Sequence, residues 1–202
     1  YYTGAGGMRQ DYPEARRWFI LAAKQGSGDA CNKLGVMYRN GLGVTADPER
    51  AILWFSMGAS LGDQYAQVNL GSSYMNGEWV ARDYAKAARW HEQAALRGNA
   101  DAQYFLGCFY AEGIGVKRDA GRAREWFTLA DRNGNERAGE LLDRLYEMDD
   151  DENLSEPLPP ARVKAGALLR EFSLIPLEAV NKGREVVLEL EDEVEVSPGE
   201  EA

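Results

Sequence analysis

Apolar residues recur along this chain at the spacing of amphipathic helices. Between residues 30 and 40 they occupy the i, i+4, i+7 and i+8 positions, which lie on one face of a helix. These residues are Ala30, Leu34, Met37 and Tyr38. The glycines that follow, beginning with Gly41, supply the positive-φ conformations that end a helix. The pattern therefore predicts a first helix that stops near Gly41.

A second helix is predicted directly after this break. Asp47-Pro48-Glu49 combines a capping carboxylate, a proline for the first turn and an acid beside the positive end of the helix dipole. The apolar and small positions that follow are Ala51, Trp54, Phe55 and Gly58. Gly62 stops this helix, and Asp63 is placed to cap the next one. The unit is thus an antiparallel pair of helices of about three turns each.

The whole pattern repeats every 36 residues. The recurring positions are Ala30, Ala66, Ala102 and Ala138, then Leu34, Leu70, Leu106 and Leu142, and then Trp18, Trp54, Trp90 and Trp126. A fixed period of this length is typical of a solenoid, in which each unit buries its apolar face against its neighbours. Such a chain presents an extended surface, which makes binding the first functional hypothesis.

Glycine also recurs inside the first helix of each unit, at Gly35, Gly71 and Gly107. A mid-helix glycine costs about 1 kcal/mol relative to alanine. Its return at one register predicts a place where two helix backbones approach too closely for a Cβ atom.

The ordered motif resembles the Sel-1-like repeat, a relative of the tetratricopeptide repeat. In one copy the matching residues are Ala102, Leu106, Gly107, Tyr110, Gly113, Gly115, Val116, Asp119, Ala123, Trp126, Phe127, Ala130 and Gly134. The resemblance spans residues 1–146 as one partial, three full and one terminal half repeat, and it implies an all-α, right-handed α-solenoid. Departures are local: Trp79 replaces a loop glycine, His91 a phenylalanine and Asp131 an alanine. Asp143 replaces the helix glycine, which predicts the end of the array.

The segments beyond the repeats are predicted by composition. Residues 147–160 are rich in acids and proline and contain no basic residue, as expected of a linker. Residues 161–183 form an amphipathic pattern that predicts a helical cap over the end of the stack. Residues 184–202 alternate apolar and acidic side chains; we favour a disordered tail, with a strand that pairs elsewhere as the alternative. The chain opens inside a repeat, so we expect it to be a fragment of a longer protein.

Charge is divided unevenly between these parts. Residues 1–146 carry 18 Lys and Arg against 17 Asp and Glu, whereas the remainder carries 5 against 16. The repeats therefore lack the basic surplus that nucleic-acid binding requires, and we predict no nucleic-acid partner. No run approaches the ~18 apolar residues of a membrane helix, so we predict no membrane insertion. The compartment is left open, with the cytoplasm favoured over a periplasmic or secreted location.

By analogy with related solenoids, the first helix of each repeat is predicted to line a concave face. Side chains that vary between repeats on these helices are then the candidates for contact with a partner. They are Asn32, Val36, Arg39, Asn40, Val68, Ser72, Met75, Asn76, Tyr104, Cys108 and Glu112. The apolar members of this set favour docking of a peptide or helix, and ordinary solvated positions are the alternative.

Trp79 is the most individual residue of the repeats. It stands where the other copies have Gly43 and Gly115. One hypothesis makes it an exposed aromatic anchor for a partner. The other, which we favour, makes it a packing residue that takes over the role of Leu42 and Ile114 because polar Glu78 occupies their position.

Candidate chemistry is sparse. His91 occupies a phenylalanine position and is predicted to be a packing residue. Cys31 and Cys108 lie more than two repeats apart and are predicted free thiols. Gly4–Gly7 aligns with the inter-helix loops and lacks the GK[ST] ending of a phosphate loop. We predict no catalytic residue, no metal site and no cofactor.

These observations predict a non-enzymatic adaptor that binds a partner protein or peptide along its concave face. The alternative is a regulatory or substrate-docking arm of a larger enzyme. Related cysteine-rich repeat proteins have been linked to β-lactam binding, but this chain lacks their regularly paired cysteines. Stacking of exposed repeat ends into homo-oligomers is a further possibility.

Overall fold

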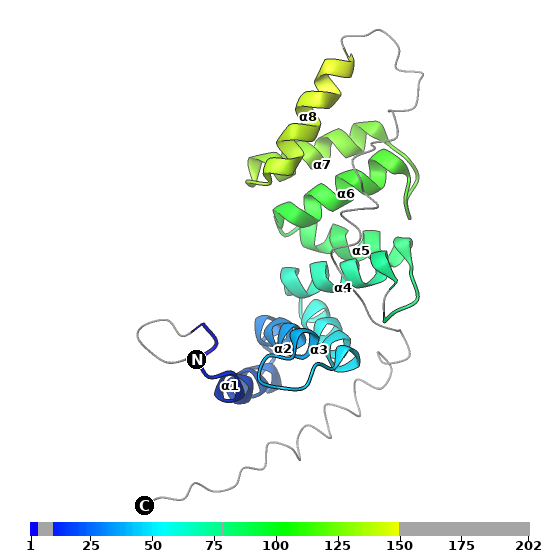
Figure 1. Cartoon of the computed structure of the whole chain (residues 1–202). Helices are drawn as coiled ribbons and strands as arrows, with labels where there is room; N and C mark the ends of the chain where they lie inside the picture. Colours follow the sequence, from blue (N-terminus) through cyan, green and yellow to red (C-terminus); the bar gives the residue numbers. More distant parts are fainter. Residues whose placement is uncertain (4–9, 78, 150–202) are drawn as a thin grey trace, which may run out of the picture.

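The described part of the chain is a stack of helices with no strand. The computed structural model describes residues 1–3, 10–77 and 79–149. Its helices are α1 (Tyr12–Lys24), α2 (Gly28–Asn40), α3 (Pro48–Ser60), α4 (Gln64–Asn76), α5 (Tyr84–Ala95), α6 (Ala100–Glu112), α7 (Ala120–Arg132) and α8 (Glu136–Asp149). They follow one another from α1 at one end of the stack to α8 at the other (Figure 1).

The α8 helix reaches further than the sequence predicts. It includes residues 147–149, which composition assigns to the linker. The rest of that linker, the predicted cap at 161–183 and the predicted tail at 184–202 lie outside the described residues.

Each helix begins at its own capping side chain. The second helices start after Asp11, Asp47, Asp83 and Asp119, which follow one another at the repeat period. In each case one carboxylate oxygen accepts a hydrogen bond from the backbone N–H three residues later, at 2.9–3.0 Å. The first helices are capped in the same way by Ser27, Asp63 and Asn99. The predicted caps at Asp47 and Asp63 are confirmed, and each contributes about 1 kcal/mol.

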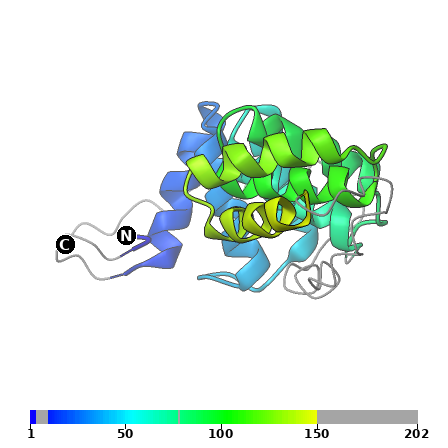
Figure 2. The ribbon, with the colours of Figure 1, turned by 90° about the horizontal axis from the view of Figure 1, so that it is seen from above.

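Packing follows the order of the chain. Every helix contacts the next, and α2 also contacts α4, so these two first helices lie next to each other. A continuous apolar core, built largely from alanine and aromatic side chains, runs from Ile20 to Leu142. Seen from above, most of the helices overlap one another, whereas α1 projects to one side (Figure 2). No single repeat encloses this core, as expected for a solenoid.

The mid-helix glycines contact aromatic rings. A Cβ atom on Gly35 would lie 2.5 Å from the ring of Phe55, and one on Gly107 would lie 2.6 Å from the ring of Phe127. The predicted contact between two backbones is therefore wrong at these positions, because the close neighbour is a side chain of the second helix. A close backbone approach occurs instead at Gly58, where a Cβ atom would lie 2.9 Å from the carbonyl oxygen of Gly28.

Candidate functional site

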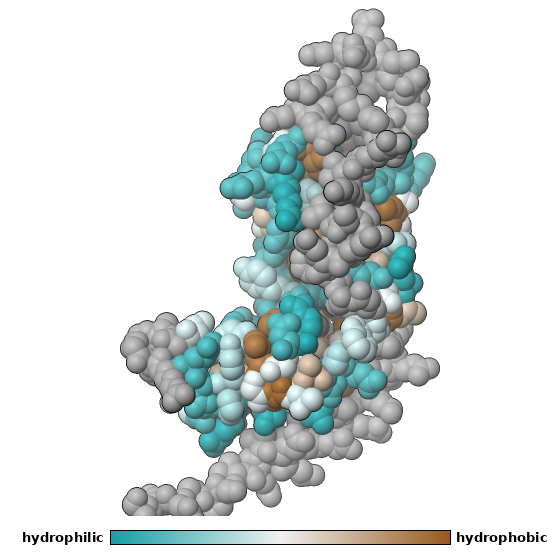
Figure 3. All heavy atoms as spheres, in the orientation of Figure 1, coloured by the Kyte–Doolittle hydropathy of each residue, from teal (hydrophilic) through white to brown (hydrophobic). Residues whose placement is uncertain are grey.

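The predicted concave-face residues differ widely in exposure. Asn40 and Glu112 are exposed, at the C-terminal ends of α2 and α6. Half-buried members are Asn32, Val36, Arg39, Val68, Asn76 and Cys108. On the side shown in Figure 3 the described surface is mostly polar, with small and separate apolar patches. Any partner surface on the first helices thus mixes polar groups with limited apolar area.

Three predicted contact residues are buried and unavailable at the surface. Met75 is 1% exposed, Tyr104 4% and Ser72 6%. The Tyr104 ring packs against Phe105 and Phe127, with centroids 5.6 and 6.0 Å away. Burial also raises the pKa of the Tyr104 hydroxyl. Their assignment to a partner-binding surface is therefore wrong, and we place them in the packing between helices.

Arg39 forms part of a polar network between α2 and α4. Its Nη1 donates to Asn69 Oδ1 at 2.9 Å, and Asn69 Nδ2 donates to Asn32 Oδ1 at 2.8 Å. The Arg39 guanidinium also lies over the ring of Phe55, 5.5 Å from its centroid. Burial lowers the pKa of Arg39. Two predicted contact residues thus hold adjacent repeats together through Asn69, which sequence reasoning missed.

The thiols are held in their protonated form. Burial raises the pKa of Cys31 to about 11 and that of Cys108 to about 12. Since the thiolate is the nucleophile, neither side chain is activated for covalent chemistry. Both cysteines are free, as predicted. Partial burial likewise raises the pKa of Glu112, at the edge of the same helix as Cys108.

His91 is a packing residue, as predicted. It is fully buried, its Nδ1 lies 2.9 Å from the carbonyl oxygen of Ala87, and its ring packs edge-on against Phe105 and Phe109. Burial lowers the pKa of His91 to about 4, so the ring is neutral near pH 7. The described residues contain no group of three His, Cys, Asp or Glu side chains that could hold a metal ion. None of the described helices is long and apolar enough to cross a membrane.

Trp79 lies at the surface, which contradicts the packing hypothesis. Its side chain is 52% exposed, and neighbouring Val80, at 2%, is the buried apolar residue of this loop. Trp79 has φ 64°, close to the 69° and 70° of Gly43 and Gly115 at the same repeat position. A left-handed conformation costs an ordinary residue about 1–2 kcal/mol, and for a bulky side chain it is rare.

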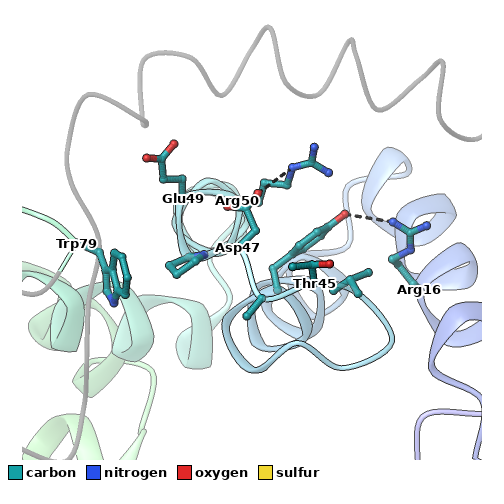
Figure 4. Close-up of a pocket in the computed structure, with 10 residues that line it drawn as sticks. Arg16, Thr45, Asp47, Glu49, Arg50 and Trp79 are labelled. Carbon is teal, nitrogen blue, oxygen red and sulfur yellow. Dashed lines mark hydrogen bonds and ion pairs between the residues drawn. The ribbon is translucent and has the colours of Figure 1, made fainter.

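The surroundings of Trp79 explain how a side chain fits there. A Cβ atom on Gly43 would collide with Tyr12, and one on Gly115 would collide with the backbone of Tyr84. Pro48 takes the repeat position of those tyrosines and lines an open pocket of about 760 Å³ together with Trp79. Figure 4 shows this pocket, with Trp79 at one end and Arg16 at the other. In the Tyr12–Gly43 pair the helix supplies the aromatic ring and the loop supplies a glycine. In the Pro48–Trp79 pair the loop supplies the aromatic ring instead.

Comparison with known proteins agrees with this architecture. The sequence model of the Sel1 repeat matches residues 1–27, 28–63, 64–99 and 100–135. Proteins built from this repeat are generally protein-interaction scaffolds and typically non-catalytic. A search of the curated proteins finds no match to the chain.

Solved structures show the same fold. A Sel1 repeat protein from Oxalobacter formigenes is 37% identical with a TM-score of 0.61, over 62% of this chain and 95% of that one. A protective antigen of uropathogenic Escherichia coli, c5321, is 28% identical with a TM-score of 0.69, over 94% of this chain and 44% of that one. Cysteine-rich protein B of Helicobacter pylori shares the fold at 24% identity and a TM-score of 0.53, over 69% of this chain and 100% of that one.

Proposed function

We propose that this chain, which belongs to the Sel1 repeat family, is a non-enzymatic scaffold that binds a partner protein through the outward side chains of its first helices. We call these side chains the first-helix face. It comprises Val36, Asn40, Val68, Cys108 and Glu112, which all retain some exposure. Arg39 and Asn32 are left out because both side chains are engaged with Asn69, and Asn76 is left out because both polar atoms of its side chain are buried.

The observation that carries this proposal is the contrast between buried and exposed positions along the first helices. Six of 13 residues of α2 and eight of 13 in each of α4 and α6 are buried, and the core is continuous from repeat to repeat. Asn40 and Glu112 of the first-helix face are exposed and stand outside that core, so they are free to differ without loss of packing, while Val36, Val68 and Cys108 pack against its edge. The face offers an exposed amide at Asn40, an exposed carboxyl group at Glu112 and half-buried apolar surface at Val36 and Val68, which together suit an extended peptide or an amphipathic helix.

The test is a charge change on the exposed members of the face. In Asn40→Arg/Glu112→Arg, both substituted positions are exposed and outside the core, so the melting temperature is expected to stay constant. Affinity capture from a native lysate with wild type and variant, read by mass spectrometry, should recover a protein that the variant loses.

The matched control places the same charges on second helices. Gln93 of α5 and Glu125 of α7 are exposed, and Gln93→Arg/Glu125→Arg changes the net charge by the same amount. If the captured protein is lost with the first variant and retained with the control, the result supports binding at the first-helix face. Equal loss with both would assign the interaction to net charge and would contradict the proposal.

A docking arm of a larger enzyme is the second candidate. The chain covers only 44% of the length of the c5321 antigen it resembles, so relatives of this fold can carry much more chain than is present here. If wild-type capture yields no partner that depends on the first-helix face, this candidate takes precedence.

A further inference from the structure

The open pocket beside Trp79 is a second place where this chain can receive a ligand. It is lined by Arg16 of α1, by the start of α3 around Pro48, and by Trp79 of the loop after α4. None of the residues of the first-helix face lines it. Its volume of about 760 Å³ falls within the range of about 300–1,000 Å³ that ligand pockets occupy.

One end of the pocket is an exposed indole. Trp79 is 52% exposed, which is close to the 56% of Trp18 in α1 and far from the 4% of Trp54. The loop holds Trp79 at a positive φ where both counterpart loops use glycine. A strained backbone at an exposed aromatic side chain is characteristic of a position maintained for contact with a ligand.

The other end is a guanidinium without a carboxylate partner. Arg16 Nη1 donates to the Tyr38 hydroxyl at 3.3 Å, while its Nε atom is buried with no hydrogen-bond partner among the described residues. No described carboxylate forms an ion pair with Arg16. Of its repeat equivalents, Ile52 and Ala88 are apolar, and Arg124 of α7 is again an arginine.

The acids of the pocket are placed so that they do not neutralise Arg16. Asp47 caps α3 through the Arg50 N–H and pairs with Arg50 Nε at 3.2 Å. Figure 4 shows Glu49 projecting on the opposite side of α3 and away from Arg16. The pocket therefore offers an available positive charge at one end and an aromatic surface at the other.

We propose that this pocket binds an extended peptide segment of a partner protein. An acidic side chain of the peptide pairs with Arg16, and an aromatic side chain packs against Trp79. A guanidinium binds a carboxylate with charge-assisted hydrogen bonds, which would also satisfy the Nε atom once the side chain adjusts. The two anchors stand at opposite ends of an open pocket, so a peptide chain can reach both (Figure 4).

The experiment measures binding of synthetic peptides to the full chain by fluorescence anisotropy. The probes are dye-labelled ten-residue Gly/Ser peptides that carry one Asp and one Phe, with two, three or four residues between them. At least one spacing is expected to bind saturably. Trp79→Gly, which restores the residue of the counterpart loops, should weaken that binding at least tenfold.

Arg16 is tested through the charge of its ligand. Arg16→Gln keeps a donor for Tyr38 and should weaken the Asp peptide about tenfold, while the matched Asn peptide binds equally to wild type and variant. Arg16→Lys keeps the charge and should retain a preference for Asp over Asn. Circular dichroism melting of each variant establishes that it is folded.

The same peptides separate this proposal from the one on the first-helix face. Asn40→Arg/Glu112→Arg should bind them as wild type does. If that variant loses the peptides while Trp79→Gly and Arg16→Gln keep them, the peptides bind on the first helices and the pocket proposal is wrong. Absence of saturable binding for every spacing also overturns it, and neither result counts against the first-helix face.

Discussion

Gly71 of α4 lies directly against the imidazole of His91 on α5. A Cβ atom on Gly71 would be 2.5 Å from His91 Nδ1 and 3.3 Å from the carbonyl oxygen of Ala87. The same relationship joins Gly35 to Phe55 and Gly107 to Phe127. In each of these helix pairs, therefore, a ring of the second helix packs against a glycine of the first.

Gly71→Val is expected to lower the free energy of unfolding by about 2 kcal/mol or more. The added carbons overlap the buried ring, and overpacking of this kind typically costs about 1–3 kcal/mol. Urea denaturation followed by circular dichroism measures the change. The double variant Gly71→Val/His91→Ala should recover part of the loss, because the shortened partner makes room. Additive effects of the two substitutions would show that the contact does not limit packing.

His91 makes stability depend on acid. Its pKa is about 4 in the folded chain against an ordinary value of 6.5, so the unfolded chain binds the proton first. Above pH 6.5 the ring is neutral in both the folded and the unfolded chain, so the lowered pKa does not affect stability there. The free energy of unfolding falls as the pH drops from 6.5 towards 4. The full loss is about 3 kcal/mol, from 1.36 kcal/mol per pKa unit.

The comparison variant is His91→Phe, which installs the residue found at Phe19, Phe55 and Phe127. We expect it to be within about 1 kcal/mol of wild type at pH 7.5. At pH 4.5 it should be the more stable of the two by a margin that grows on acidification. Parallel curves of unfolding free energy against pH would show that His91 is not desolvated.

Trp79→Gly is expected to be about 1 kcal/mol more stable than Trp79→Ala. Both substitutions remove the indole, which is 52% exposed, but only glycine relieves the positive φ of Trp79. Thermal melting of the two variants measures the difference. Equal melting temperatures would mean that the left-handed conformation costs a side chain nothing at this position.

Arg97→Asn is expected to stabilise the turn between α5 and α6. The buried Gln67 Oε1 has no hydrogen-bond partner among the described residues. One repeat later, Asn133 Nδ2 donates to Gln103 Oε1 at 2.8 Å, and Arg97 holds the repeat position of Asn133. The new bond should add about 1 kcal/mol. Arg97→Ala lacks the donor and serves as the control in the same denaturation series.

Arg39→Met should destabilise the contact between α2 and α4 by about 1–2 kcal/mol. It removes the donor to Asn69 Oδ1 and the cation over Phe55. The next repeat holds Val68, Phe105 and Met75 at the positions of Asn32, Asn69 and Arg39. The triple variant that copies this apolar set should regain most of the lost stability in urea. Failure to regain it would mean that the two interfaces differ in backbone spacing.

The helices and their caps could be predicted from the sequence, but which side chains of the first helices reach the surface could not. The caps at Asp47 and Asp63 were predictable because a capping side chain acts on its own backbone within three residues. The burial of Met75 and Tyr104 was not predictable, because variation between repeats does not by itself indicate exposure. Buried positions between repeats also vary when each pair of helices solves its packing separately. The hydrogen bonds of Asn69 join residues from different repeats, and no local pattern reveals them.

The network of Asn32, Asn69 and Arg39 also fixes the sequence in which the units can be joined. A unit that presents an amide and a guanidinium to its successor needs an asparagine there, whereas the following unit has Val68 and Met75 at those two positions and its successor has Phe105 at the position of Asn69. Exchanging the successors would bury Arg39 against a phenyl ring and leave Asn69 among apolar groups, at a penalty for unpaired polar atoms. Repeats that are otherwise similar therefore have interfaces that match only their own neighbours. Exchange of repeats within the array is restricted to exchanges that keep each pair of matching interfaces together.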